Sequence, residues 1–363
     1  MKKHANIPLF IPHLGCPNRC VFCNQHTISG TVCFHSAAVR DEIETALTTI
    51  PTDVPCEIAF FGGSFTGIDR ELMIRLLELA ADYVRAGRVR SIRFSTRPDY
   101  ITPEILRILA RYPIGMAELG IQSMSDRVLA ACDRGHTAMD TVNACRLLRE
   151  AGIPYGGQMM LGLPESTAAD ERECAAAIAE LGCTESRIYP TIVFRDTPLA
   201  ALWENGAYKP LSIADAVERA ADVEEIFLAH GVHTLRIGLC DSENLHGSEC
   251  LAGPVHPAMG ELVASRIYLR RIENALERLP HGVPEKMTIV VPKGDISMAI
   301  GQRKTNTLQI KNKYNVKSLH FLENPALIRY NIVLKTTDFK WILRQRPQYA
   351  GFSAQNLDVL AHP

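Results

Sequence analysis

The sequence predicts an α/β fold in which a partial barrel of parallel strands is followed by a small, basic α+β unit. Two observations carry this prediction. Between residues 7 and 230, short apolar runs alternate strictly with amphipathic segments, which is typical of parallel strands joined by right-handed helical crossovers. Residues 281–346 contain 12 Lys and Arg against 4 Asp and Glu, a net charge of +8, whereas residues 1–280 contain 27 against 35, a net charge of −8.

Six strand–helix units make up the predicted barrel. The strands are expected at residues 7–14, 57–61, 91–95, 115–122, 154–161 and 187–194. The helices that follow them are expected at residues 37–50, 69–86, 138–151, 167–181 and 213–230, with a further one beginning at Thr102-Pro103. Asp69 is a typical N-cap residue, and a proline suits the first turn of a helix. Because no G-x-G-x-x-G motif follows the first strand, a partial (β/α)6 barrel is favoured over a flat dinucleotide-binding sheet.

The most specific pattern is a C-x3-C-x2-C loop directly after the first strand, formed by Cys16, Cys20 and Cys23. Soft thiolate ligands favour an iron–sulfur cluster or zinc. A four-iron cluster or a zinc ion that is held by protein alone needs four ligands. The next cysteine, Cys33, lies ten residues further on. The spacing therefore predicts a cluster with one iron left open to a ligand that is not protein. The alternatives are a metal-free loop and a zinc site that borrows His13 or His26.

Further candidate groups lie at the ends of later strands, where a barrel collects its chemistry. Gly62 and Gly63 would let the backbone approach a ligand closely, although a Gly-Gly pair is also an ordinary turn. Glu118, Gly120 and Gln122 would share one strand face, and polar groups inside a barrel need partners. Two more side chains fall at such positions, Arg134 and Gln158. Arginine suits a carboxylate, but Arg134 also reads as a surface residue before a helix cap.

Composition limits the class of protein. The chain has 363 residues, of which 47% are apolar and 22% charged, as in ordinary globular proteins. No apolar run reaches the ~18 residues that span a membrane, and the basic N-terminus leads into the cysteine loop and not into a cleavage site. Eleven scattered cysteines do not suggest a disulfide framework. We therefore expect a cytoplasmic protein without a membrane partner.

The order of the motifs resembles the Elongator catalytic-subunit branch of the radical S-adenosylmethionine (SAM) superfamily over roughly residues 5–270. Besides the cysteine loop, the matching segments are Phe-Gly-Gly-Ser-Phe-Thr, Ser-Thr-Arg-Pro-Asp-Tyr, Glu-Leu-Gly-Ile-Gln-Ser, Arg-Gly-His-Thr, Met-Leu-Gly-Leu-Pro and Ile-Tyr-Pro-Thr. Oxygen-independent coproporphyrinogen oxidases are similar in general plan, but less closely.

This resemblance implies a TIM-like partial barrel that carries a 4Fe–4S cluster and SAM. It implies that Cys16, Cys20 and Cys23 bind three irons while SAM chelates the fourth, with Phe22 near the adenine. Gly62 and Gly63 would lie near the methionine, so a side chain at Gly63 is expected to obstruct SAM and spare the cluster. Gln122, Arg134 and Gln158 would surround the SAM carboxylate and ribose. No residue is predicted to act on the substrate itself, and the implied partner is a one-electron donor such as flavodoxin or ferredoxin.

The C-terminal part departs from the Elongator pattern. Nothing after residue 270 resembles the acetyltransferase domain of those subunits, so we expect a domain over residues 1–270, a basic one over 281–346 and a tail over 347–363. The basic segment predicts the order strand, helix, loop, helix, strand, strand, which resembles the KH modules that clamp nucleic-acid backbones. Its loop is Gly301-Gln302-Arg303-Lys304, in which lysine replaces the second glycine. The alternative is a basic packing or dimerisation domain.

These features predict a radical SAM enzyme that reductively cleaves SAM to a 5′-deoxyadenosyl radical and acts on RNA, in particular tRNA. One alternative is an oxidoreductase of the coproporphyrinogen-oxidase kind that acts on a small molecule. Another is an RNA-binding iron–sulfur protein without turnover. Salt-dependent binding of RNA separates the first from the second, and cleavage of SAM separates the third from both.

Overall fold

The computed structural model describes residues 4–17, 19–30, 34–239, 247–279, 282–335, 340–345 and 357–362. Cys33 lies outside these ranges. The chain forms two compact units, one made of Met1–Ile213 and Val232–Val255 and the other of Ala214–Gly231 and His256–Pro363. Among the described helices, none combines the length and the apolar character that crossing a membrane requires.

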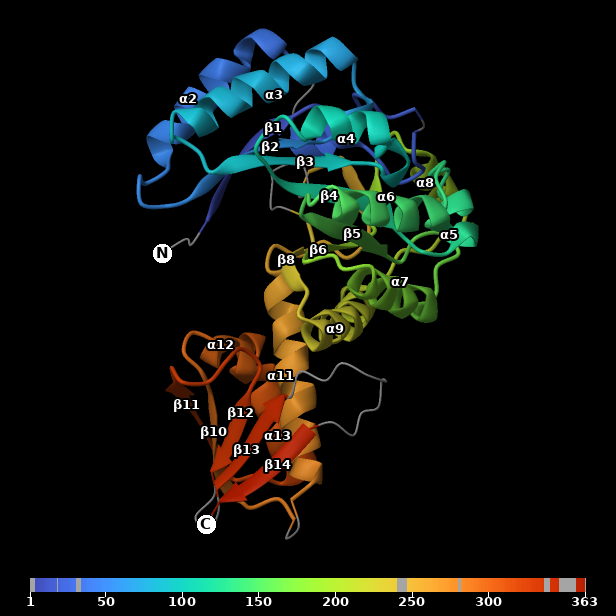
Figure 1. Cartoon of the computed structure of the whole chain (residues 1–363). Helices are drawn as coiled ribbons and strands as arrows, with labels where there is room; N and C mark the ends of the chain where they lie inside the picture. The colour runs from blue at the N-terminus through green and yellow to red at the C-terminus, as the bar shows by residue number, and fades with distance from the viewer. Residues whose placement is uncertain are drawn as a thin grey trace. The chain divides into compact units, whose positions relative to one another are not determined.

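The N-terminal unit contains a seven-stranded sheet in the order β1-β2-β3-β4-β5-β6-β8. Its strands are β1 (Ala5–Phe10), β2 (Cys56–Phe61), β3 (Ser91–Thr96), β4 (Ile114–Gln122), β5 (Tyr155–Leu161), β6 (Glu185–Pro190) and β8 (His233–Ile237). Every neighbouring pair is parallel, and the helices lie along the outer face (Figure 1). The predicted α/β partial barrel is confirmed, with β8 as a seventh strand that the sequence did not predict.

Except for the first, the helices of the barrel begin after a residue whose side chain caps their first turn. They are α2 (Val39–Thr49), α3 (Arg70–Arg85), α4 (Pro103–Leu109), α6 (Ala138–Glu150) and α7 (Ala168–Glu180). Asp69 accepts a hydrogen bond from the backbone N–H of Leu72 (2.9 Å), which fixes the first turn of α3. Thr137 and Thr167 form capping boxes at the starts of α6 and α7. Three short helices were not predicted: α1 (Gln25–Ser29), α5 (Asp126–Ala131) and α8 (Pro198–Glu204). Side chains cap two of them, that of Asn24 at α1 and that of Thr197 at α8, but their few residues show no helical periodicity.

Two predicted strands are shorter than expected. The strand predicted at residues 7–14 ends at Phe10, because a turn with left-handed backbone at His13 (φ 56°) and Gly15 (φ 72°) follows it. The strand predicted at residues 187–194 is divided: β6 ends at Pro190, and β7 (Val193–Phe194) pairs antiparallel with β9 (Cys250–Ala252). Proline lacks the N–H that a ladder needs, which accounts for the break at Pro190.

The inner face of the sheet carries a layer of buried charges near the beginnings of its strands. The guanidinium of Arg93 on β3 contacts Glu57 (3.1 Å), Glu118 (2.9 Å) and Glu185 (2.8 Å). Glu118 also binds Arg187 through both carboxylate oxygens, at 2.7 and 3.1 Å. Burial alone would lower the pKa of Arg93, but the hydrogen bonds to these carboxylates raise it. Four strands are therefore joined at this level by side chains as well as by their backbones.

The C-terminal unit begins with two helices held together by ion pairs. Arg270 of α11 (Met259–Glu277) contacts three acidic residues of α9 (Ile213–His230): Glu218 (2.7 Å), Asp222 (2.8 Å) and Glu225 (3.1 Å). Because of these contacts, α9 belongs with the C-terminal unit. The domain boundary at residue 270 that the sequence suggested stays a prediction.

The remaining elements form a second sheet with the strand order β11-β10-β12-β13-β14. The elements are β10 (Lys286–Pro292), α12 (Ile296–Ile300), α13 (Thr305–Tyr314), β11 (Ser318–Asn324), β12 (Ile332–Lys335), β13 (Lys340–Gln345) and β14 (Leu357–His362). The expected order of strand, helix, loop, helix, strand, strand is present, and β10 and β11 are parallel. Strand β14 lies within the predicted tail but pairs with β13, so it belongs to the sheet.

Candidate functional site

The cysteine loop lies at the carboxyl ends of the strands and is held by backbone hydrogen bonds from two neighbouring segments. The N–H of Ser64, after β2, donates to the carbonyl of Leu14 (2.9 Å), and the N–H of His13 donates to Gly62 (3.1 Å). On the other side, the N–H of Val21 donates to the carbonyl of Cys132, directly after α5 (3.1 Å). Loops far apart in the sequence therefore position the three cysteines.

Gly63 is required for this packing. A Cβ atom at Gly63 would lie 2.4 Å from the carbonyl oxygen of Leu14 and 2.5 Å from that of Ile11, and neither atom can move without moving the cysteine loop. A side chain at Gly63 would therefore displace the loop that carries the cysteines. This corrects the expectation that such a change spares the cluster site. The predicted proximity of Gly62 and Gly63 to SAM stays a prediction.

The three cysteines differ in burial, and the pKa values of two of their thiols are raised. Cys20 is buried, and Cys16 and Cys23 are half-buried. Burial raises the pKa of the Cys16 thiol and, together with the charge of Cys20, that of Cys23 to about 12. Thiols in such surroundings ionise when a metal binds them. The side-chain amide of Gln25 donates to the sulfur of Cys23 (3.4 Å).

Among the described residues, no three His, Cys, Asp or Glu side chains form a group that could hold a single metal ion. An iron–sulfur cluster makes a different demand, since its thiolates bind separate irons. The three cysteines on one loop therefore remain candidates for a cluster.

Two buried arginines lie beside the cysteines. Arg134 is 7% exposed and donates from one terminal nitrogen to the sulfur of Cys20 (3.4 Å) and from the other to the carbonyl of Gly120 (2.7 Å). Its own carbonyl accepts a hydrogen bond from Arg97 (2.6 Å), which Asp99 holds through two further bonds. Buried cations at this position favour a negatively charged occupant, which fits a thiolate-ligated iron–sulfur cluster.

The sequence analysis did not name Arg97 or His136 as site residues, although both lie in motifs that it quoted. The backbone N–H of Arg97 donates to Ser64 (3.1 Å), so the segment after β3 is tied to that after β2. His136 is 4% exposed, and neither of its ring nitrogens has a partner among the described residues. Burial, Arg134 and Arg97 lower the pKa of His136 to about 4, so its ring is neutral near pH 7. The Arg-Gly-His-Thr motif was the available signal for this histidine.

The remaining predicted polar residues form a connected group next to Arg134. At the end of β4 the register shifts between Gly120 and Gln122, and Gln122 takes a left-handed conformation (φ 68°). The amide of Gln158, on β5, donates to Gln122 through a long hydrogen bond of 3.4 Å. Gln122, Arg134 and Gln158 are thus brought together, whereas Glu118 lies in the layer of buried charges described above.

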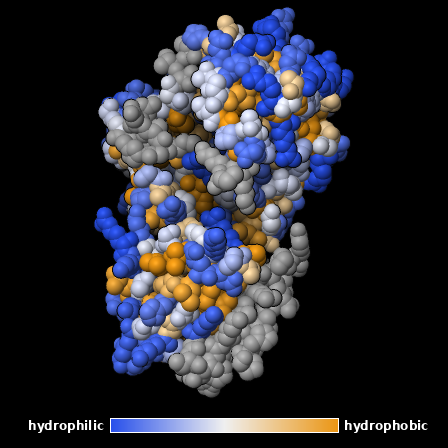
Figure 2. Space-filling model, turned by 90° about the vertical axis from the view of Figure 1, so that its left-hand side faces the viewer, coloured by the Kyte–Doolittle hydropathy of each residue, from blue (hydrophilic) through white to orange (hydrophobic). Residues whose placement is uncertain are grey.

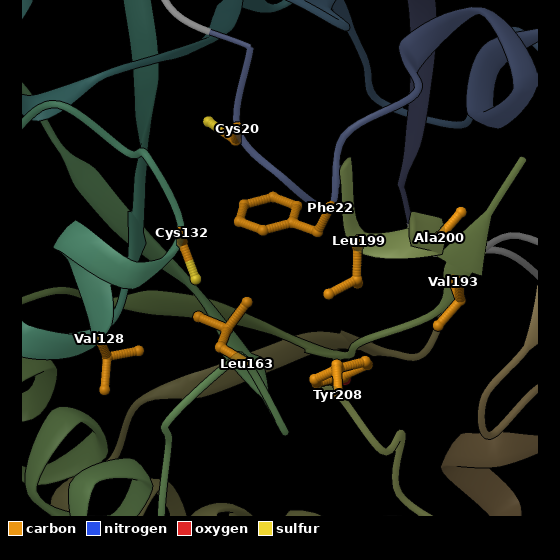
Figure 3. Packing of buried hydrophobic residues seen from close by; sticks show 9 residues of the cluster. All are labelled: Cys20, Phe22, Val128, Cys132, Leu163, Val193, Leu199, Ala200 and Tyr208. Atoms are coloured by element: carbon orange, nitrogen blue, oxygen red, sulfur yellow. The ribbon is translucent and has the colours of Figure 1, made fainter. Parts of the chain in front are cut away.

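An apolar cluster covers the other side of the cysteine loop (Figure 3). Phe22 lies among side chains that come from α5, from the end of β5 and from the segment after β7: Val128, Cys132, Leu163, Val193, Leu199, Ala200 and Tyr208. The N–H of Leu199 donates to Val21 (2.9 Å), and the hydroxyl of Tyr208 donates to the carbonyl of Gly162 (2.6 Å). This cluster excludes water from one side of Cys20, and it buries most of the Phe22 ring.

Comparison with known families agrees with this geometry. Residues 10–178 match the model of the radical SAM superfamily, and residues 184–271 match that of the radical SAM C-terminal domain. The chain belongs to the radical SAM superfamily. It is therefore a radical SAM enzyme, and the family implies a 4Fe–4S cluster and SAM as cofactors. The cysteines, the buried cations and the apolar cover described above fit such a cluster.

Among its relatives, this radical SAM protein resembles Elongator-type proteins. It is 25% identical over 233 residues to the tRNA uridine(34) acetyltransferase of Methanocaldococcus infernus, a match that covers 59% of this chain and 42% of the relative. It is 31% identical over 135 residues to human Elongator complex protein 3, covering 36% of this chain and 25% of that protein. The chain thus spans less than half the length of these two relatives.

A solved structure has the same fold. The archaeal Elp3 of Methanocaldococcus infernus, with an N-terminal deletion, superposes with a TM-score of 0.59 at 19% sequence identity. The match covers 99% of this chain and 83% of the other. The predicted similarity to the Elongator branch is confirmed by these comparisons.

Proposed function

We propose that this enzyme holds a 4Fe–4S cluster through Cys16, Cys20 and Cys23, cleaves SAM reductively and acts on RNA, in particular tRNA. The observation that carries the proposal is the position of the three thiols. They lie on one loop at the carboxyl ends of the strands, beside the buried guanidinium of Arg134. A cluster held by these residues would supply one-electron reduction of SAM, which would give methionine and a 5′-deoxyadenosyl radical able to take a hydrogen atom from the substrate.

The chain's own residues then bind and orient the cofactors, and they exclude water. Arg134 and Arg97 offset the negative charge of the thiolates. The amides of Gln122 and Gln158, with Arg134, offer donors and acceptors to the polar parts of SAM. Phe22 and the apolar cluster around it keep water from the cysteine loop. The electron itself comes from an external donor such as flavodoxin or ferredoxin, and we propose that the enzyme works in the cytoplasm.

The RNA part of the proposal rests on charge and on the relatives. Two of the proteins that this chain resembles are named for tRNA modification or for Elongator. The segment 281–346 has a net charge of +8, and basic surfaces favour nucleic acid. Arg303 and Lys304 are exposed on the loop between α12 and α13, where a KH-like module would contact a phosphate backbone.

The decisive experiment for the chemistry is anaerobic reconstitution with iron and sulfide. The wild-type chain should hold about four irons and, once reduced, convert SAM slowly to 5′-deoxyadenosine without substrate. Cys20→Ala should lose both properties. Cys250→Ala, a half-buried cysteine on β9, should keep both and serves as the matched control. A Cys20→Ala variant that keeps its full iron content would contradict the proposed ligand set.

A further inference from the structure

The cysteines outside the cysteine loop are a feature of the chain that the proposed function does not use. On the C-terminal unit, hydrophobic side chains gather at the surface (Figure 2), whereas the thiols gather in the interior of the N-terminal unit, to which all cysteines of the chain belong. Five of the described cysteines outside the loop are buried and free of disulfides: Cys56, Cys132, Cys145, Cys174 and Cys183.

Two of these thiols, those of Cys145 and Cys183, are joined by a hydrogen bond. Cys145 lies within α6, and Cys183 lies between the end of α7 and the beginning of β6. Arg149 follows Cys145 by one helical turn, and its guanidinium donates to the carbonyl of Leu181 and to the hydroxyl of Tyr155 (3.2 Å). That hydroxyl donates to the same carbonyl (2.7 Å). The turn that carries Cys183 is therefore held against α6 by side chains of α6 and β5.

The hydrogen bond makes the two sulfurs chemically unequal. The thiol of Cys183 donates to Cys145, and this bond lowers the pKa of the Cys145 thiol. Burial opposes the shift, and the charge of Arg149 adds to it. Because the thiolate is the nucleophilic form, Cys145 is the attacking sulfur and Cys183 the resolving one. A thiol of lowered pKa next to a second thiol is typical of cysteines that respond to oxidants.

We propose that Cys145 and Cys183 are a modification site, which a peroxide converts reversibly into a disulfide. The sulfur of Cys145 attacks one oxygen of hydrogen peroxide, the O–O bond breaks, and the other oxygen leaves as water with the thiol proton. The sulfur of Cys183 then attacks the resulting sulfenic acid, forms the S–S bond and releases a second water. Each sulfur loses one electron, and the two oxygens of the peroxide gain them. A thiol reductant returns the two electrons and reverses the step.

The position of the pair determines which oxidant reaches it and what the disulfide does. Cys145 is 0% exposed and Cys183 is 4% exposed, which excludes bulky reagents. Gly182 and Thr184, on either side of Cys183, are exposed, so local opening of this turn admits a molecule as small as hydrogen peroxide. The disulfide would enclose β5 and α7 in a covalent loop, which constrains the unfolded chain, and it would stop the oxidation of Cys145 before its irreversible stages.

The test uses the full reconstituted chain and hydrogen peroxide as the oxidant. Remaining thiols are blocked with N-ethylmaleimide under denaturing conditions, and the protein is digested with trypsin and analysed by mass spectrometry. Cleavage leaves Cys145 in the peptide 135–146. Cys183 lies in the peptide 173–187 together with Cys174. Cys174→Ala is therefore the matched control, because it removes a buried thiol of the same peptide and leaves the proposed pair intact.

We expect a cross-link between the two peptides in the wild-type chain and in Cys174→Ala. It should disappear in Cys145→Ala, in Cys183→Ala and after treatment with dithiothreitol. The cross-linked wild-type chain should also unfold at a higher urea concentration than the same sample after dithiothreitol, because the covalent loop is then open. The wild type and Cys174→Ala identify the pair even if one of the other variants folds poorly. The inference is overturned if the native wild-type chain gives no such cross-link, or if the cross-link persists in Cys183→Ala.

Discussion

At the scale of single residues, the cysteine loop depends on how closely two turns approach each other. Gly63 faces the carbonyls of Leu14 and Ile11 at distances that leave no room for a side chain. Its neighbour Gly62 differs, because a Cβ there would meet its nearest atoms at an ordinary 3.5 Å, although its φ of 92° strains any side chain. Comparing substitutions at Gly62 and at Gly63 therefore distinguishes the effect of close packing from the effect of backbone strain.

Gly63→Ala should lower the iron content of the reconstituted chain well below that of Gly62→Ala, because only the first substitution pushes the cysteine loop away. Iron and sulfide bound per chain, measured after anaerobic reconstitution and desalting, checks this. Equal iron contents in the two variants would show that the loop tolerates a side chain at Gly63.

Arg134 is the second residue whose contacts suggest a measurable role. A hydrogen bond to a ligating sulfur and a nearby positive charge both stabilise the reduced, more negative cluster. Arg134→Gln removes the charge, whereas Arg134→Lys keeps it and changes the geometry of the donor.

Arg134→Gln should therefore shift the reduction potential of the cluster to a more negative value, with a smaller shift in Arg134→Lys. Redox titration followed by electron paramagnetic resonance measures the shift. Arg127→Gln is the control, because Arg127 lies on the neighbouring α5 but has a 50% exposed side chain that pairs with Asp170 (3.0 Å). Unchanged potentials in both Arg134 variants would leave this residue with a purely structural role.

At the scale of elements, the strands of the barrel are joined on their inner face by charge. Arg93 on β3 forms ion pairs with carboxylates from β2, β4 and β6, and its side chain is only 6% exposed. Removing one partner from a buried ionic group is costly, because the remaining charges lose their compensation.

Arg93→Met should destabilise the chain by about 3–5 kcal/mol in the free energy of unfolding, the usual cost of breaking a buried pair. Urea denaturation followed by circular dichroism measures it. Arg88→Met provides the comparison: Arg88 also binds a carboxylate, that of Glu44, through two bonds (2.7 and 2.9 Å), but at the surface. Arg88→Met should lower the free energy of unfolding far less, since water replaces the lost partner at the surface. A similar cost for both variants would argue against the buried network.

At the scale of the whole molecule, the cysteine loop and the basic loop lie in different compact units. The three cysteines belong to the N-terminal unit, and the loop with Arg303 and Lys304 belongs to the C-terminal one. Changes to the loop should therefore alter the binding of RNA without altering the cleavage of SAM in the absence of substrate.

Replacing Arg303 and Lys304 together by Glu should abolish binding of total tRNA at moderate salt. Neutral single variants should each flatten the log–log dependence of affinity on salt by about one unit. Lys313→Gln should have less effect, because two glutamates already offset its charge. Electrophoretic binding assays at several salt concentrations measure all three. If the wild-type chain binds no RNA even at low salt, the small-molecule alternative takes precedence.

The sequence by itself determined the features that depend on local order. Three features could be identified because each acts within a few residues: the alternation of strands and helices, the helix starts at Asp69 and Thr102-Pro103, and the cysteine spacing. The same holds for the order of elements around the loop Gly301–Lys304. Periodicity and capping are short-range properties, so the order of the elements is retained in the fold, although the strands predicted at residues 7–14 and 187–194 are shorter or divided.

Only the tertiary structure decided which residues surround the cysteines and where the units divide. The contact between Arg134 and Cys20 joins residues 114 positions apart, and that between Arg93 and Glu185 joins residues 92 positions apart. The ion pairs between α9 and α11 join residues 45 to 52 positions apart. Contacts of this kind leave no pattern in the local sequence, because they depend on how the strand ends come together in the fold. For the same reason the sequence did not reveal how closely Gly63 packs on the carbonyls of Leu14 and Ile11.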